Sequence, residues 1–347
     1  MAGRVKPKPM RVLALTQEDT LPPEGVVPDD EVARAPYRTD YDVRAALCEL
    51  GHEVVFAAHD THLEDVRDAL DEHRPHVVFN LLEMFDRQPR LLPHLLGYLE
   101  LAGQAYTGCN PVGMLFASDK ALQRKILRHH RIATPEYATV PIGRTFRRPK
   151  RLEFPLIVKS ATEHGSQGIA RASVVTSDEK LTDRIQYMHD SIGTAALVEE
   201  FIEGRELYVG VLGNKRLETF PVWEMRFTSL PEGAPNIATG KLKWDIAHQE
   251  ALGLETGPAR GLGEEMTTRI HRRCKRAYRA LEQSGYARFD LRVRPDGRVY
   301  VIESNPNPEL AWNSEFPASA KAAGYDYPRL LQRIMTLGQT WHRTPKG

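Results

Sequence analysis

A turn sequence between two strand-like runs is the feature that most constrains how this chain can fold. The residues Arg-Pro-Asp-Gly-Arg at 294–298 separate two largely apolar runs, 287–293 and 299–304. Asp-Gly is typical of a two-residue hairpin loop, and such a loop would place Asp290 directly opposite Glu303. One face of the hairpin would then carry two opposed carboxylates, with Cβ atoms about 5 Å apart.

Two further polar side chains fall on the same face, because residues two apart on a strand point to the same side. In this register Arg288 lies opposite Asn305. Two carboxylates and an amide oxygen form the all-oxygen ligand set that suits Mg²⁺. An arginine beside such a site would hold a phosphate or stabilise developing negative charge. The alternative is a solvated polar face on an edge hairpin, and a register slip of one residue would break the pairing.

The first third of the chain alternates strand and helix patterns. The expected strands cover 11–15, 53–57 and 76–82, and the expected helices cover 40–50, 63–70 and 91–101. Strands separated by helices predict a parallel sheet with crossover helices. Residues 22–36, rich in proline and acidic side chains, predict an exposed loop.

After a helix expected at 119–131, the pattern changes to strand runs joined by tight turns, which predicts antiparallel α+β units. The expected strands cover 156–159, 169–175, 195–201, 206–212, 216–223, 287–294 and 298–304, and the expected helices cover 177–189 and 264–284. We therefore expect three domains, covering 1–118, 119–203 and 204–340.

Charge and composition narrow the class of protein. Lys plus Arg number 47 and Asp plus Glu number 46, so the chain has no overall positive charge that would favour nucleic-acid binding. The basic clusters at 147–151 and 271–273 are interpreted as solvated faces. No run approaches the ~20 apolar residues of a spanning helix, and no secretion-signal core follows the N-terminus. Three scattered cysteines predict neither a disulfide framework nor a zinc site. We expect a cytoplasmic protein with no membrane partner.

Two segments carry phosphate and nucleotide signals. Lys159 ends an apolar strand and precedes the small, glycine-bearing run 160–168, which can place a cation and backbone N–H groups around a phosphate. The order of a Walker loop is absent, and a flexible hairpin is the alternative. At 198–206 several acidic residues follow the end of an apolar strand. Their carboxylates can accept hydrogen bonds from ribose hydroxyls, and the backbone groups beside them can bond to the edge of adenine. The alternative is an exposed acidic turn.

Together these segments resemble the ATP-grasp superfamily and, within it, the D-alanine–D-alanine ligase family. The residues that carry the resemblance are Tyr106–Gly108, Asp119-Lys120, Ile132–Pro135, Val158-Lys159, Gly165–Gly168, Glu199–Ile202 with Glu206, Ala287–Asp290 and Glu303–Pro308. The resemblance runs from about Pro75 to Gly324. It implies an ATP-grasp fold, with an N-terminal Rossmann-like parallel-sheet domain followed by two α+β domains that clamp ATP.

The resemblance also implies a role for each matching position. Phosphate contacts would come from Lys120, Lys159 and Lys243, with Lys241 the alternative to Lys243, and from Ser166 in a loop that closes over the phosphates. Adenine would be held by Glu199, Glu200, Phe201 and Ile202, and the ribose by Glu206. The metal ligands would be Asp290, Glu303 and Asn305. Arg288 would stabilise a tetrahedral intermediate, and Ser314 would hold the second substrate's carboxylate.

The implied reaction joins an amino-acid or other small carboxylate to an amine, using ATP and Mg²⁺ (two ions, with Mn²⁺ a substitute), and the family implies a possible homodimer. The sequence departs from the family in two places. The family's N-terminal Gly-Gly-x-Ser-x-Glu-His-x-x-Ser run is replaced by residues 15–20, where Glu18 could substitute for the missing glutamate at a different spacing. Residues 80–83 replace the family's His-Gly run. The sequence therefore leaves open two D-alanines, another amino acid, a glutamate-adding ligase, a carboxylase or a non-catalytic ATP-binding module.

Overall fold

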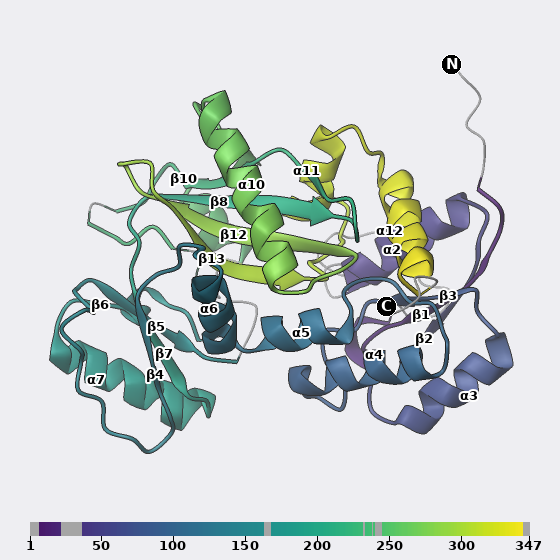
Figure 1. Ribbon diagram of the computed structural model, residues 1–347, viewed down its shortest axis with the longest axis horizontal. Coiled ribbons are helices and arrows are strands. Elements are labelled where there is room, and N and C mark those ends of the chain that lie inside the picture. The colour runs from purple at the N-terminus through teal and green to yellow at the C-terminus, as the bar shows by residue number, and fades with distance from the viewer. Residues whose placement is uncertain are drawn as a thin grey trace.

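Three β-sheets organise the described part of the chain, as the computed structural model shows (Figure 1). The structure describes residues 7–21, 37–162, 168–231, 233–237, 239 and 245–342. The loop expected at 22–36 lies outside these residues. Among the helices of the described ranges, none is both long enough and apolar enough to cross a membrane.

The first sheet is parallel, as the alternating pattern predicts. Its strands are β1 (Arg11–Leu15), β2 (Glu53–Ala57) and β3 (Val77–Asn80), in the order β2-β1-β3. The helices nearest to them in the chain are α2 (Arg38–Glu49), α3 (Leu63–His73) and α4 (Leu92–Leu101). The run 12–15 of β1 is fully buried, which explains why this apolar strand takes the central place.

The last helices of the chain return to the first sheet. They are α11 (Glu315–Ala322) and α12 (Tyr327–His342). Leu330 and Ile334 of α12 belong to one buried cluster with Val12 of β1 and Phe79 of β3, and α12 lies beside α2 and the first sheet in Figure 1. Strand β1 and helix α12, far apart in the sequence, therefore share a core.

The second sheet is antiparallel, with the order β4-β7-β5-β6. Its strands are β4 (Tyr137–Val140), β5 (Leu156–Ser160), β6 (Val174–Val175) and β7 (Ala196–Glu200), and α7 (Asp178–Tyr187) packs on them through Leu181 and Ile185. The strand expected at 169–175 is wrong over most of its length. Residues 171–173 form a 3-10 turn, and two residues alone pair with β5.

The third sheet has the order β11-β10-β8-β12-β13, with β9 paired to β8. Its strands are β8 (Arg205–Leu212), β9 (Glu218–Thr219), β10 (Trp223–Phe227), β11 (Leu254–Pro258), β12 (Tyr286–Val293) and β13 (Val299–Pro306). The strand expected at 216–223 is therefore interrupted. Helix α9 (Ile246–Ala251) precedes β11 and was not indicated by the sequence patterns.

Two helices distant in sequence cover the third sheet. They are α6 (Lys120–His129) and α10 (Glu264–Ala280). Leu127 of α6 and Ile270 of α10 share a buried cluster with Phe289 of β12. Helix α6 thus precedes the second sheet in the chain but packs on the third, and the division into domains at 118 and 203 stays a prediction.

Helix α5 (Pro111–Ser118) leads into α6 and is also absent from the expected elements. Its start nevertheless carries ordinary helix signals, since Asn110 accepts a hydrogen bond from the Gly113 N–H at 3.0 Å and proline takes the first helical position. Asn110 also donates to the Glu282 carbonyl at 2.7 Å, which ties this helix to the loop before β12.

The β12–β13 hairpin has the expected pairs but a different turn. Asp290 pairs with Glu303, and Arg288 pairs with Asn305. The two-residue loop is wrong: the Arg294 N–H donates to the Arg298 carbonyl, leaving a three-residue loop whose last residue, Gly297, has φ of 80°. A register shift next to Asp290 leaves Ile302 as the extra residue of a bulge. The bulge offsets the longer loop, and so the predicted pairs are retained.

Candidate active site

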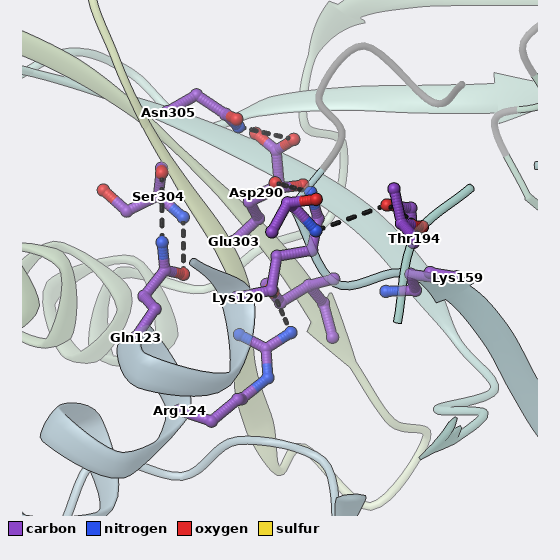
Figure 2. A network of polar contacts seen from close by, with 12 residues as sticks. Lys120, Gln123, Arg124, Lys159, Thr194, Asp290, Glu303, Ser304 and Asn305 are labelled. Atoms are coloured by element: carbon purple, nitrogen blue, oxygen red, sulfur yellow. Dashed lines mark hydrogen bonds and ion pairs between the residues drawn. The ribbon is translucent and has the colours of Figure 1, made fainter. Parts of the chain in front are cut away.

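Polar side chains of helix α6 and of the two hairpin strands gather at the β12–β13 hairpin (Figure 2). Asp290 of β12 lies beside Glu303 and Asn305 of β13, and Lys120 of α6 points toward them. The Lys120 ammonium lies 3.0 Å from Glu303 Oε1, and its side chain is 6% exposed. The two opposed carboxylates therefore share one face with a buried cation next to them.

The start of α6 places Lys120 between two sheets. Asp119 caps the helix by accepting from the Leu122 N–H at 2.9 Å. The Lys120 N–H donates to the Ala161 carbonyl just after β5, at 3.1 Å. Because its backbone is bonded to one sheet and its side chain to the other, Lys120 joins the phosphate segment to the hairpin.

Lys159 lies in a buried group of three charges. Its ammonium is 2.7 Å from Glu199 Oε2, and the Arg124 Nε donates to Glu199 Oε1 at 2.7 Å. Burial alone would raise the pKa of Glu199, but Arg124 and Lys159 lower it to about 2. The carboxylate therefore stays ionised, and the trio keeps a net positive charge that suits a phosphate. In the structure the Glu199 carboxylate contacts these two cations, and its expected adenine contact stays a prediction.

Two α6 residues that were not among the predicted site residues attach the helix to β13. Gln123 accepts from the Ser304 N–H at 3.0 Å and donates to the Ser304 carbonyl at 3.3 Å (Figure 2). Arg124 donates to the carbonyl of Ile302, the bulge residue. The signal was present in the sequence, since Lys120, Gln123 and Arg124 have the spacing of one helix face.

Arg288 holds Asp290 from the same strand. Its Nε donates to Asp290 Oδ1 at 2.8 Å and its Nη2 to Oδ2 at 3.1 Å, while its Nη1 donates to Glu315 of α11 at 3.3 Å. Asn305 donates to Asp290 Oδ2 at 3.1 Å. Burial, with a smaller contribution from Glu303, raises the pKa of Asp290 to about 6 even though Arg288 opposes the shift.

These groups fit a hard divalent cation. The two carboxylates and the amide oxygen of Asn305 are the kinds of ligand that such a cation takes, and a cation beside Asp290 would oppose the effect of burial on its pKa. Among the described residues, no cluster of three or more His, Cys, Asp or Glu side chains offers another metal site. The predicted ligands Asp290, Glu303 and Asn305 thus lie together, and their binding of Mg²⁺ stays a prediction.

The expected nucleotide segment lies at the end of β7 and the start of β8. Ile202 and Phe201 are buried, and the Arg292 guanidinium lies 5.7 Å from the Phe201 ring centroid. Glu206 accepts from the Tyr208 hydroxyl at 2.8 Å and contacts Arg292 through its other oxygen. Glu200 contacts Arg294 in the hairpin turn.

Ser314 lies one residue before α11, next to the Glu315 that contacts Arg288. Its hydroxyl lies 3.0 Å from the Glu309 carbonyl and 2.8 Å from the Ala311 carbonyl. The structure thus brings Ser314 to the edge of the hairpin group through its neighbour. The predicted Ser166 and Lys243, and the alternative Lys241, lie outside the described residues.

The carboxyl ends of the first sheet carry a second set of polar contacts. Gln17, next to Glu18, accepts from the Glu83 and Met84 N–H groups at 3.1 Å and donates to Asp60 Oδ2 at 2.8 Å. One side chain therefore ties together the segments that follow β1, β2 and β3. This is where the sequence departs from the family's first-substrate stretch.

Comparison with known proteins agrees with this geometry. Residues 126–336 match the family model described as D-ala D-ala ligase C-terminus. The D-alanine–D-alanine ligase of Desulforudis audaxviator is 33% identical over 70% of this chain and 76% of its own length. A Sinorhizobium fredii protein named uncharacterized protein y4sG is 30% identical over 84% of this chain and 85% of its own.

A solved structure extends the likeness to the whole fold. The D-alanine–D-alanine ligase of Bacillus anthracis, complexed with ATP, superposes with a TM-score of 0.74 at 22% identity, covering 96% of this chain and 99% of that one. The sheets and the hairpin define an ATP-grasp protein, which confirms the fold expected from the sequence. Within that class, the chain belongs to the D-alanine–D-alanine ligase family.

Proposed function

We propose that the protein is an ATP-dependent, ADP-forming ligase that makes an amide bond between an amino-acid or other small carboxylate and an amine. The observation that supports this most directly is the joining of Lys120 and Arg288 to the Asp290–Glu303 pair, with Lys159 in the buried trio that Arg124 ties to the same hairpin. Phosphate-binding cations, a metal-type ligand set and a charge-stabilising arginine are the parts that phosphoryl transfer to a carboxylate requires.

The proposed reaction has two steps. A carboxylate oxygen of the first substrate attacks the γ-phosphorus of ATP, the bond to the β-phosphate oxygen breaks, and ADP leaves. The amine of the second substrate then attacks the acyl carbon of the acylphosphate, the bond to the phosphate oxygen breaks, and the amine loses a proton. Mg²⁺ bound to the hairpin would spread the charge of the transferring phosphoryl group.

The chain's own residues bind and orient in this scheme. Lys120 and Lys159 hold the phosphates, and Glu206 together with the segment from Glu199 to Ile202 holds the nucleoside. Arg288 faces the negative charge that develops on the acyl oxygen. Ser314, at the start of α11, holds the second carboxylate.

The segments expected near the first substrate differ from those of the family. Two of the features that accompany D-alanine in the family, a glycine-rich stretch after β1 and a His-Gly run after β3, are replaced here by residues 15–20 and 80–83. Gln17 instead bonds to the backbone of the second of these segments. We therefore propose that the substrate pair includes an amino acid or small carboxylate other than two D-alanines.

A screen of ADP and phosphate release tests this function. The purified chain, with ATP and Mg²⁺, is given D- and L-amino acids singly and in pairs, and amide products are identified by mass spectrometry. We expect release that depends on an added amino acid, and a dipeptide or related amide. ATP turnover that is unaffected by every added amine would indicate another reaction, and turnover that depends on added bicarbonate would indicate a carboxylase. Nucleotide binding without any turnover would indicate a binding module.

A further inference from the structure

Tyr208 lies at the centre of the third sheet, between two groups that the proposed reaction uses separately. It is on β8, 6% exposed, and its cross-strand partner on β12 is Asp290. Its hydroxyl contacts Glu206, and its ring faces Arg288.

The hydroxyl of Tyr208 bonds to the carboxylate expected at the ribose. It donates to Glu206 Oε1 at 2.8 Å. Burial, reinforced by the charge of Glu206, raises the pKa of Tyr208 well above 10, so the hydroxyl stays protonated and remains a donor. Since Arg292 contacts the other oxygen, Glu206 is fixed from two sides, and each oxygen still has a lone pair for a ligand hydroxyl.

The ring of Tyr208 covers one face of Arg288. The guanidinium carbon lies 5.0 Å from the ring centroid, within the range of a cation–π contact. The edges of the guanidinium donate to Asp290 and Glu315. The two carboxylates therefore restrict movement of the guanidinium within its own plane, and the Tyr208 ring restricts its movement out of that plane.

We propose that Tyr208 is a positioning residue that orients Glu206 through its hydroxyl and Arg288 through its ring, and so aligns the nucleotide with the acyl-transfer end of the site. This inference rests on the proposed ligase function. It assigns two separable effects to two parts of one side chain. A tyrosine that only fills the core would give no such separation.

Two substitutions separate the parts. Tyr208→Phe keeps the ring and removes the hydroxyl, while Tyr208→Leu removes both and keeps much of the apolar volume. Tyr325 provides a matched control away from the site: its hydroxyl donates to Glu218 at 2.8 Å and its ring faces Arg329 at 5.6 Å. The same two substitutions are made there.

ATP affinity is measured by calorimetric titration with Mg²⁺, and kcat and KM are measured with the best substrate of the screen. For Tyr208→Phe we expect ATP binding about five-fold weaker and kcat within about two-fold of wild type, because one charge-assisted hydrogen bond is lost. For Tyr208→Leu we expect kcat a further ten-fold lower, roughly, because Arg288 loses its aromatic neighbour. Both Tyr325 variants should stay within about two-fold in each quantity.

Several results would overturn the inference. If Tyr208→Phe binds ATP as tightly as the wild type, the hydroxyl does not orient Glu206 for the nucleotide. This binding test does not depend on turnover. An absence of amino-acid-dependent turnover in the wild type would count against the ligase function instead. Equal kcat in the Phe and Leu variants removes the role of the ring. Tyr325 variants that lose as much as their Tyr208 counterparts would reduce both effects to stability, which circular dichroism and thermal unfolding of every variant monitor.

Discussion

The hairpin end of the site is held by contacts between oppositely charged side chains, whereas at the first sheet neutral polar side chains bond to backbone N–H groups and to carboxylates. At the hairpin, Lys120 pairs with Glu303 and Arg288 with Asp290. At the first sheet, Gln17 bonds to two backbone N–H groups, and Asp40 contacts the Thr16 hydroxyl.

The hairpin end and the first-sheet end should respond differently to substitution. Removing one member of a buried ion pair leaves the other charge uncompensated, which is costly. A neutral side chain bonded to backbone N–H groups can be exchanged for another acceptor at lower cost. The part of the site that we propose to bind phosphate is thus rigidly specified. The part that we propose to lie near the first substrate should tolerate exchange of its polar side chains more readily.

The largest effect is expected at the opposed carboxylates. Asp290→Ala or Glu303→Ala should lower ADP release by about 10³-fold or more, because a metal ligand contributes several kcal/mol of transition-state stabilisation. Phosphate release with saturating Mg²⁺ measures this. Asp296→Ala, in the exposed turn of the same hairpin, is the control and should keep near-normal turnover. Wild-type turnover in either of the first two variants would refute the metal assignment.

Arg288→Lys comes next. A lysine keeps the positive charge but not the planar fork that binds both oxygens of Asp290, so we expect kcat to fall by about 10²- to 10³-fold while the fold is retained. Steady-state kinetics, together with circular dichroism, measure this loss. Equal rates for wild type and variant would show that the fork geometry is not used, and the contrast between the two ends of the site would weaken.

The hairpin also shows what the sequence could predict. Asp290 and Glu303 were placed opposite each other because two apolar strands and an Asp-Gly turn are local signals. The turn was nevertheless one residue longer than expected, and the bulge at Ile302 compensated for it. A bulge leaves no mark in a period-2 pattern, so the correct pairing rested on two errors that cancelled.

Contacts between distant segments could not be predicted in this way. Arg124 reaches the bulge carbonyl of Ile302, and Gln123 pairs with Ser304, through packing of α6 on a sheet formed much later in the chain. Gln17 likewise bonds to backbone that follows another strand. Periodicity identified β1 to the residue, since its apolar run is continuous, but it carries no information on which loop a polar side chain meets.

Lys159→Ala tests the charged end through binding alone. Its ammonium carries the positive charge expected at the phosphates, so we expect the dissociation constant of ATP to rise by about 30- to 100-fold, the effect of losing one hydrogen bond to a charged group. Calorimetric titration measures it. Lys180→Ala, an exposed lysine of α7 on the same sheet, is the control and should bind ATP as the wild type does. Unchanged affinity in Lys159→Ala would contradict the phosphate role.

The smallest effect is expected at the first sheet, from Asp40→Asn. Burial raises the pKa of Asp40 to about 6, above the ordinary value of 3.8, although the Thr16 and Thr20 hydroxyls oppose the shift. The folded chain therefore keeps this proton at a pH where the unfolded chain has lost it. The stabilisation is complete below about pH 4 and is lost as the pH rises through 6, by about 3 kcal/mol in total.

Asparagine cannot ionise, so the variant should gain stability relative to wild type by about that amount between about pH 4 and about pH 7.5. Urea unfolding at the two pH values measures the difference, and Asp65→Asn, exposed on α3, should follow the wild-type curve. If the Asp40→Asn and wild-type curves stay parallel, the pKa of Asp40 does not change on folding and the carboxylate is ionised in the folded chain across the range. The first-sheet end would then contain a stabilised buried charge like the hairpin, and the contrast between the two ends would no longer explain why one matches the family and the other departs from it.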